Sequence, residues 1–263
     1  MNSAIALVIA YVILQIVYSL AITAAAKLFG LSGNLSLGYS ILPTEAGLYS
    51  KNRVLLIYSA GPISYLMMSL VGRIGFYTSR RRKDIVNLCF FWMQILGISL
   101  FFSQFALTMF YDSYDSLELY TGPAVIAAWF RLESPINIVI TIVAASLCVL
   151  AGLWFTKPLL SLSHSFKLSN NFYGRRKLFF FMIFIPFLIA TVLLFAMTWP
   201  KHNQMLFINF AGLALFLIGM FLILHNFKGV VQIRRNNVLD KVSLPGIVAL
   251  VVSFIAIVLI DQY

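Results

Sequence analysis

The sequence predicts an all-α, polytopic membrane protein with about seven transmembrane helices in one integral membrane domain. Of its 263 residues, 61% are apolar and only 10% are charged. A soluble domain is nearer half apolar and a quarter charged, so this chain has more apolar surface than a water-soluble core could bury. The mean hydropathy of +0.94 agrees with this reading. Together these observations exclude a cytosolic enzyme and a secreted disulfide scaffold.

A transmembrane helix needs roughly 20 mainly apolar residues. Segment 28–44 is free of charge, but it is interrupted by Gly, Ser, Asn and Pro, which favour turns. We therefore expect a short β-hairpin or re-entrant segment at 31–50, and an interfacial position for residues 119–130, which are too few to cross. Seven charge-free stretches of sufficient length each predict one transmembrane helix: 1–26, 54–72, 85–111, 134–156, 178–200, 202–227 and 242–260.

The positions of the basic residues predict the orientation. With alternating sides, 14 Lys and Arg fall in the second, fourth and sixth loops and 5 in the others, while the acids divide 2 to 6 in the opposite sense. Basic residues are enriched in cytoplasmic loops. We therefore expect a cytoplasmic N-terminus, an external C-terminus and a location in a bacterial inner (cytoplasmic) membrane.

The net charge of +11 is explained by these loops, so no nucleic-acid partner is expected. Clustered Lys and Arg beside transmembrane helices attract anionic lipid head groups. The predicted head-group contacts are Arg80, Arg81, Arg82, Lys83, Arg175, Arg176 and Lys177.

The chemistry-bearing residues predict neither a metal nor a cofactor. His164, His202 and His225 have no His or Cys beside them at ligand spacing, whereas a zinc site needs three or four converging ligands. No charged residue lies near the middle of a predicted span, which argues against an ion-coupled transporter. The polar residues inside the spans are expected to bridge helices by hydrogen bonds. They are Gln15, Ser19, Thr23, Gln94, Ser99, Ser103, Gln104 and Asn209.

A concentration of acids on the predicted external side suggests a recognition surface. Asp112, Asp115 and Glu118 lie within seven residues of each other in a chain with only eight acids. Together with Glu45 and the extended segment 31–50, they are candidates for binding a basic partner. The alternative is a solvated loop that packs on its neighbours.

The stretch Tyr18–Gly30, YSLAITAAAKLFG, resembles the first motif of the site-two-type intramembrane metalloproteases. That motif is HExxH followed by an Ala-rich helix end, a basic residue and a Gly. In this alignment Tyr18 and Ile22 occupy the positions of the two zinc histidines. Ser19 occupies the position of the general-base Glu. The turn-rich segment that follows is similar to the membrane-associated β-hairpin of that family.

Two later motifs extend the resemblance. Gly61 and Pro62, within Ser-Ala-Gly-Pro, resemble the AGPxxN signature of the family, with Tyr65 in place of its Asn. Asp115, followed by Ser, is similar to the Asp-Gly that provides the third metal ligand. The resemblance implies a degenerate three-helix protease-like core at 1–118 and a four-helix extension at 119–263.

The resemblance implies that the chain lacks the catalytic residues of the family. Zinc hydrolysis needs imidazole ligands and a carboxylate that activates water, and the motif residues of this chain provide neither set. We therefore expect a non-catalytic scaffold or binding subunit, a pseudoprotease and not an enzyme, in a larger membrane complex. One alternative is a transporter or channel component for a neutral or small solute. A second is an enzyme acting on lipid or lipid-linked substrates, whose phosphates the basic loops would grip.

Overall fold

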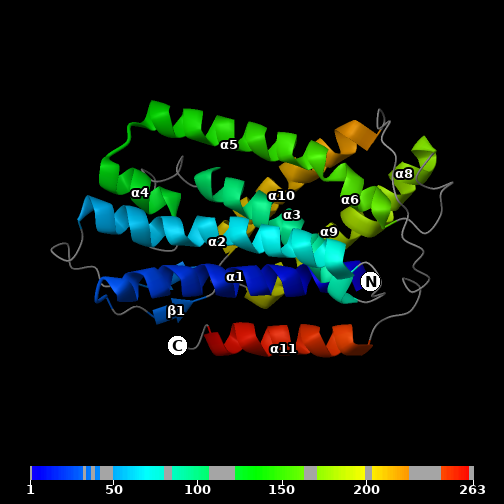
Figure 1. The fold of residues 1–263 in the computed structure, drawn as a ribbon, viewed down its shortest axis with the longest axis horizontal. Helices are drawn as coiled ribbons and strands as arrows, with labels where there is room; N and C mark the ends of the chain where they lie inside the picture. Colours follow the sequence, from blue (N-terminus) through cyan, green and yellow to red (C-terminus); the bar gives the residue numbers. More distant parts are fainter. Residues whose placement is uncertain are drawn as a thin grey trace.

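The structure of the protein is a computed structural model, shown in Figure 1. It describes residues 2–31, 34–36, 39–41, 50–79, 85–106, 122–162, 171–198, 203–224 and 244–260. The long helices are α1 (Asn2–Leu28), α2 (Lys51–Thr78), α3 (Ile85–Ala106), α5 (Ser134–Trp154), α9 (Ile185–Thr198), α10 (Asn203–Leu224) and α11 (Leu244–Ile260). The short elements are α4 (Pro123–Phe130), α6 (Thr156–Ser161), α8 (Phe172–Phe179), a π-helical turn (Phe180–Phe184), β1 (Asn34–Ser36) and β2 (Tyr39–Ile41).

The all-α membrane architecture is confirmed. Within the described ranges, six helical segments are long and apolar enough to cross a bilayer. The seventh predicted span forms α11, whose 17 residues reach the lower limit of the length that a span needs. The segments that meet the length criterion are Asn2–Leu28, Lys51–Thr78, Ile85–Ala106, Ser134–Ser161, Phe172–Ala196 and Leu206–Leu224.

The second helix is longer than the sequence predicts. The expected span 54–72 lies inside α2, which begins at Lys51 and continues through Arg73 to Thr78. A search for charge-free stretches ends at the first cation, whereas a real helix continues because long Lys and Arg side chains reach water from its ends. The Ser50 side chain caps the start of α2 by accepting a hydrogen bond from the Arg53 N–H at 3.4 Å.

Helix α1 is the centre of the bundle. It contacts α2, α3, α9 and α11, and most of its residues from Asn2 to Ala26 are buried. A helix that is apolar all round is the kind that other helices surround. In Figure 1, α1 runs from one end of the bundle to the other, with α2 on one side and α11 on the other. The first element of the chain therefore packs against four of the long helices.

Helix α3 joins the first helices of the chain to later ones, because it contacts α1 and α2 as well as α5 and α10. The pair α5 and α10 crosses at very short range. A Cβ atom at Gly152 would collide with the carbonyl of Phe216, and one at Gly219 with the carbonyl of Val149. Small residues that let two backbones approach are typical of helix contacts in membranes.

The predicted hairpin is present between α1 and α2. Strands β1 and β2 pair antiparallel, with Asn34 opposite Ile41 and Ser36 opposite Tyr39, and both contact α1. Residues 42–49 of the predicted segment lie outside the described ranges. The segment expected at the interface contains α4, whose 8 residues are too few to cross a bilayer.

Candidate functional site

The candidate site is a set of buried polar side chains inside the bundle, which we call the central polar cluster. Its members come from four helices that are far apart in sequence. Each member has at most 4% of its surface exposed. They are Tyr11, Gln15 and Tyr18 of α1, Tyr65 of α2, Ser103 and Gln104 of α3, and Asn209 of α10.

One chain of hydrogen bonds crosses the cluster from α1 to α10 and back to α1. Tyr18 Oη donates to Gln104 Oε1 at 3.3 Å, and Gln104 Nε2 donates to Asn209 Oδ1 at 3.5 Å. Asn209 Nδ2 then donates to Tyr11 Oη at 3.3 Å. Ser103 Oγ also donates to Asn209 Oδ1, at 3.2 Å. Such bonds compensate polar groups that have left water, and they fix the relative positions of the helices.

Helix α2 joins the central polar cluster through Tyr65. The rings of Tyr18 and Tyr65 are stacked, with centroids 4.8 Å apart and 22° between their planes. Tyr65 Oη donates to Gln15 Oε1 at 3.0 Å. The stacked rings therefore stabilise the packing of α1 against α2 by dispersion, in addition to the hydrogen bond.

Tyr18 fits a gap that two glycines leave open. A Cβ atom at Gly61 would lie 2.5 Å from Cε2 of the Tyr18 ring. A Cβ atom at Gly122 would lie 2.9 Å from the Tyr18 hydroxyl and 3.3 Å from Cγ of Pro62. Gly122 also has φ +51°, which favours glycine on conformational grounds. The Tyr18 ring therefore packs against Gly61 of α2.

Three buried amides are incompletely bonded, namely Gln15, Gln94 and Asn137, whose Oδ1 has no partner among the described residues. Gln15 Nε2 and both side-chain polar atoms of Gln94 have no hydrogen-bond partner among the described residues, and each side chain is 1% exposed. A buried amide without a partner costs free energy. Gln15 and Gln94 therefore retain hydrogen-bonding capacity inside the bundle.

The cluster consists of neutral groups. Phenols, amides and a hydroxyl can bind and orient through hydrogen bonds, but none of them is a good base or a strong metal ligand. The described part of the chain contains no group of three or more His, Cys, Asp or Glu that could hold a metal ion.

The residues at the protease-like motif positions lie close together where they are described. Tyr18 contacts Gly61 and stacks on Tyr65, while Ser19 and Ile22 are buried at 2% and 1% exposure. Asp115, the last of the motif residues, lies outside the described residues, as do Glu45, Asp112 and Glu118 of the predicted recognition surface.

The predicted head-group contacts divide in two. Arg80, Arg81, Arg82 and Lys83 lie outside the described ranges. Arg175, Arg176 and Lys177 lie on α8, and the first two have partners within the chain. Arg175 Nη1 donates to the carbonyl of Leu224 at the end of α10, at 3.3 Å.

Arg176 places its guanidinium 5.5 Å and 5.9 Å from the ring centroids of Phe172 and Phe221. Cations near a helix C-terminus are favourable, so these two arginines help to attach α8 to α10. Lys177 is exposed.

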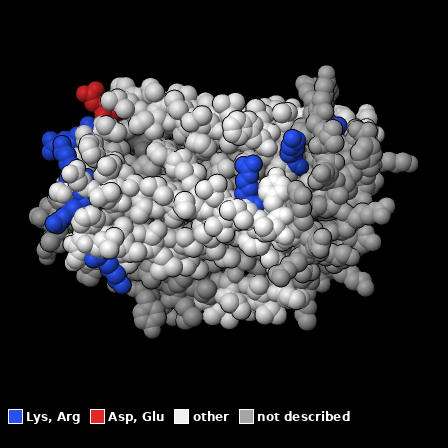
Figure 2. All heavy atoms as spheres, in the orientation of Figure 1, with Lys and Arg blue, Asp and Glu red and all other residues white. Residues whose placement is uncertain are grey.

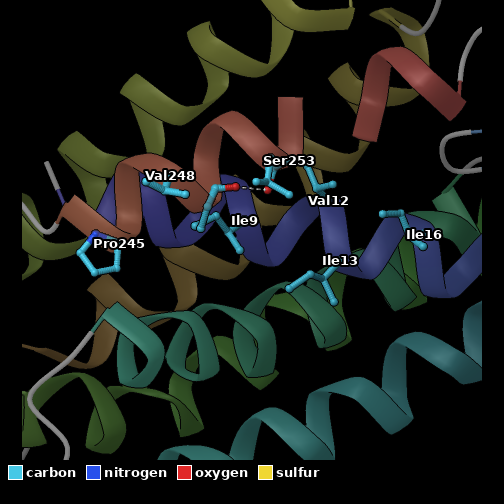
Figure 3. Close-up of a pocket in the computed structure, with 9 residues that line it drawn as sticks. Ile9, Val12, Ile13, Ile16, Pro245, Val248 and Ser253 are labelled. Atoms are coloured by element: carbon cyan, nitrogen blue, oxygen red, sulfur yellow. Dashed lines mark hydrogen bonds between the residues drawn. The ribbon is translucent and has the colours of Figure 1, made fainter. Parts of the chain in front are cut away.

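An apolar groove of about 720 Å³ lies between α1 and α11. Figure 3 shows the side chains that line it, with Ile9, Val12, Ile13 and Ile16 on α1 and Pro245, Val248 and Ser253 on α11. The single hydroxyl of this lining, on Ser253, donates to the Ala249 carbonyl of its own helix at 2.8 Å. The groove therefore suits an occupant without polar groups.

Comparisons with known protein families, with curated proteins and with solved structures gave no match to this chain. The fold and the buried site nevertheless define the class, which is a multi-pass, all-α membrane protein.

Part of the central polar cluster is predictable from the sequence. Gln15, Ser103, Gln104 and Asn209 were expected to bridge helices, and their hydrogen bonds confirm it. Tyr11 was missed because a tyrosine in an apolar run resembles an aromatic core residue. Gly122 was missed as well, although the Thr-Gly-Pro step before α4 is a turn signal that marks it.

Proposed function

We propose that this chain is a non-catalytic scaffold or binding subunit of a larger complex in a bacterial inner membrane, with a cytoplasmic N-terminus. The observation that carries the proposal is the way in which Tyr18 is held. Its ring fills the gap over Gly61 and stacks on Tyr65, and its hydroxyl is bonded to Gln104. A site built to bind or convert a substrate needs open, preorganised space.

The degenerate protease resemblance fits this proposal. The positions that would bind zinc and activate water in the family hold Tyr18, Ser19 and Ile22, which are packed inside the bundle. A protease-like core that has exchanged its ligands for tightly packed side chains retains a rigid frame. In the proposed role, that frame presents loops to a partner, and the acids Glu45, Asp112, Asp115 and Glu118 supply charge complementary to a basic segment.

The test is purification of the full chain in native lipid, followed by identification of any stoichiometric partner. We expect a partner that stays bound to wild type and whose retention falls several-fold in the triple variant Asp112→Asn, Asp115→Asn and Glu118→Gln. Tyr18→Phe is the matched control, because it changes the interior of the bundle and should leave capture unchanged. A lone protein in native lipid, with no partner at any salt concentration, contradicts the proposal.

A second candidate function is supported by the incompletely bonded amides. Gln15 and Gln94 retain hydrogen-bonding capacity inside the bundle, as residues along a path for a neutral polar solute would. The protein reconstituted alone into vesicles distinguishes the two functions. Solute uptake that is lost in Gln15→Leu and Gln94→Leu favours a carrier over a scaffold.

A further inference from the structure

A second pocket lies at the end of the bundle where α4 ends and α2 begins. Its volume is about 540 Å³, and it is lined by Lys51, Ala128, Trp129, Phe130 and Arg131. Ligand pockets commonly measure about 300–1,000 Å³. Two of the five lining residues are cations, so the pocket differs in kind from the apolar groove between α1 and α11.

The backbone at the end of α4 places these residues together. Arg131 adopts the left-handed conformation, with φ 50°, and its N–H bonds to the carbonyls of Ala127 and Ala128. This cap ends the helix directly after Trp129 and Phe130 and brings Arg131 beside the first residue of α2. Lys51 Nζ lies 5.7 Å from the centroid of the Phe130 ring, a cation–π contact that holds the ammonium group at the pocket.

The lining of the pocket contains two cations and no acid, and the acid of the described ranges, Glu133, lies two residues after Arg131. Neither Lys51 nor Arg131 forms an ion pair with an acid of the described ranges. The first turn of α2 contains no acidic residue but does contain Arg53, whose guanidinium lies 5.8 Å from the Phe29 ring centroid. Figure 2 shows Lys and Arg at this end of the molecule with acidic atoms beside them, and further Lys and Arg toward the other end. Two cations facing one cavity create a field that favours an anion.

The aromatic residues indicate the depth of the pocket in the membrane. Trp129 and Phe130 are 37% and 40% exposed, and they lie at the end of a bundle whose helices span the bilayer. Trp is enriched where hydrocarbon meets water. An anion that reaches this level, among aromatic side chains and cations, is the phosphate of a phospholipid or a phosphate from the adjoining water.

We propose that the pocket formed by Lys51, Trp129, Phe130 and Arg131 binds a phosphate group. The shared chemistry is a phosphate oxyanion that accepts charge-assisted hydrogen bonds from an ammonium and a guanidinium. The inference is independent of the scaffold function, and it concerns residues at the opposite end of α2 from Arg73 and the predicted head-group contacts.

The experiment measures lipid retained by the full chain in nanodiscs and then by native mass spectrometry. The nanodiscs contain phosphatidylglycerol and phosphatidylcholine in equal amounts. The test variant is Lys51→Gln with Arg131→Gln. The control is Arg73→Gln, an exposed cation 22 residues further along α2 and thus about 33 Å away along the helix. A third variant, Lys51→Arg with Arg131→Lys, keeps both charges.

We expect wild type, the control and the charge-conserving variant to retain phosphatidylglycerol alike. Each Lys or Arg near an anionic surface strengthens binding roughly fivefold, so the test variant should retain it about 25-fold more weakly. Displacement of the lipid by millimolar inorganic phosphate, in wild type only, identifies free phosphate as the preferred source, and no displacement identifies the phospholipid. Equal retention by wild type and the test variant, or an equal loss in Arg73→Gln, overturns the proposal.

Discussion

Ser3 donates a hydrogen bond from Oγ to the main-chain carbonyl of Met182, at 2.7 Å. In an α-helix that carbonyl would accept from the N–H of residue 186, but Pro186 has no N–H. The chain passes this point through the π-helical turn Phe180–Phe184. Ser3 also accepts from Trp92 Nε1 at 3.0 Å. The second residue of α1 thus joins α1 to α3 and to the proline-interrupted helix.

Replacing Ser3 by Ala should lower the free energy of unfolding by about 1 kcal/mol, because it leaves Met182 O and Trp92 Nε1 without this partner. Unfolding in mixtures of SDS and mild detergent measures the change. Ser146→Ala is the control, since the Ser146 hydroxyl is exposed and bonds only to the Ile142 carbonyl of its own helix.

In an α-helical turn, the N–H that Pro186→Ala adds would point to the Met182 carbonyl. The cost of Ser3→Ala should therefore be smaller in the Pro186→Ala background than in wild type. A double-mutant cycle with the two single variants and the double variant measures this coupling. Strictly additive effects would show that Ser3 does not replace the missing donor.

Gly61→Val should destabilise the bundle by about 1–3 kcal/mol, because its side chain would enter the space of the Tyr18 ring. Tyr18→Phe keeps the ring and removes the hydroxyl with its bond to Gln104, so it should cost about 1 kcal/mol or less. Thermal unfolding of both variants gives the comparison. Tyr18→Leu, which removes ring atoms, should partly rescue Gly61→Val, and no rescue would contradict the proposed fit.

Gly152→Leu should separate α5 from α10, because even a Cβ atom at this position collides with the Phe216 backbone. We expect a loss of several degrees in thermal midpoint or a loss of folded yield. Ser146→Leu on the exposed face of the same helix is the matched control. It should be close to neutral, since lipid accepts an added leucine. Equal effects of the two variants would place the contact elsewhere.

The purified chain should hold no zinc in its membrane core, since no three ligands converge in the predicted layout. Elemental analysis of the protein purified without chelators measures the metal content. One tightly held zinc per chain that is lost in Asp115→Asn would overturn the pseudoprotease reading.

The two ends of the bundle should be labelled from opposite sides of the membrane. In Figure 1, α1 begins at one end and α11 finishes at the other, as an odd number of crossings requires. Single cysteines at Ser79 and Asn237 should react with an impermeant thiol reagent only from the cytoplasmic side. A cysteine at Ser113 should react only from outside. Labelling of all three from one side is incompatible with the predicted orientation.

The sequence by itself determined that this is a multi-pass helical membrane protein and approximately where each helix lies. Those features follow from local quantities, since the bilayer fixes the length and apolar character of a span. The hairpin at 34–41 and the polar residues inside the helices were predictable from the sequence for the same reason. Turn chemistry and isolated polar residues are visible without knowledge of any neighbour.

Only the tertiary structure decided that α1 is central and that Tyr18, Tyr65, Gln104 and Asn209 form one cluster. In a soluble helix the apolar face reveals which side is buried. Within lipid both sides of a helix are apolar, and no hydrophobic difference separates a lipid-facing residue from one that faces another helix. The partners are instead determined by close approach, as at Gly61 and Gly122, and by the hydrogen bonds of the central polar cluster, which join residues 50 or more positions apart. These depend on helix pairing, which no local pattern in this chain encodes.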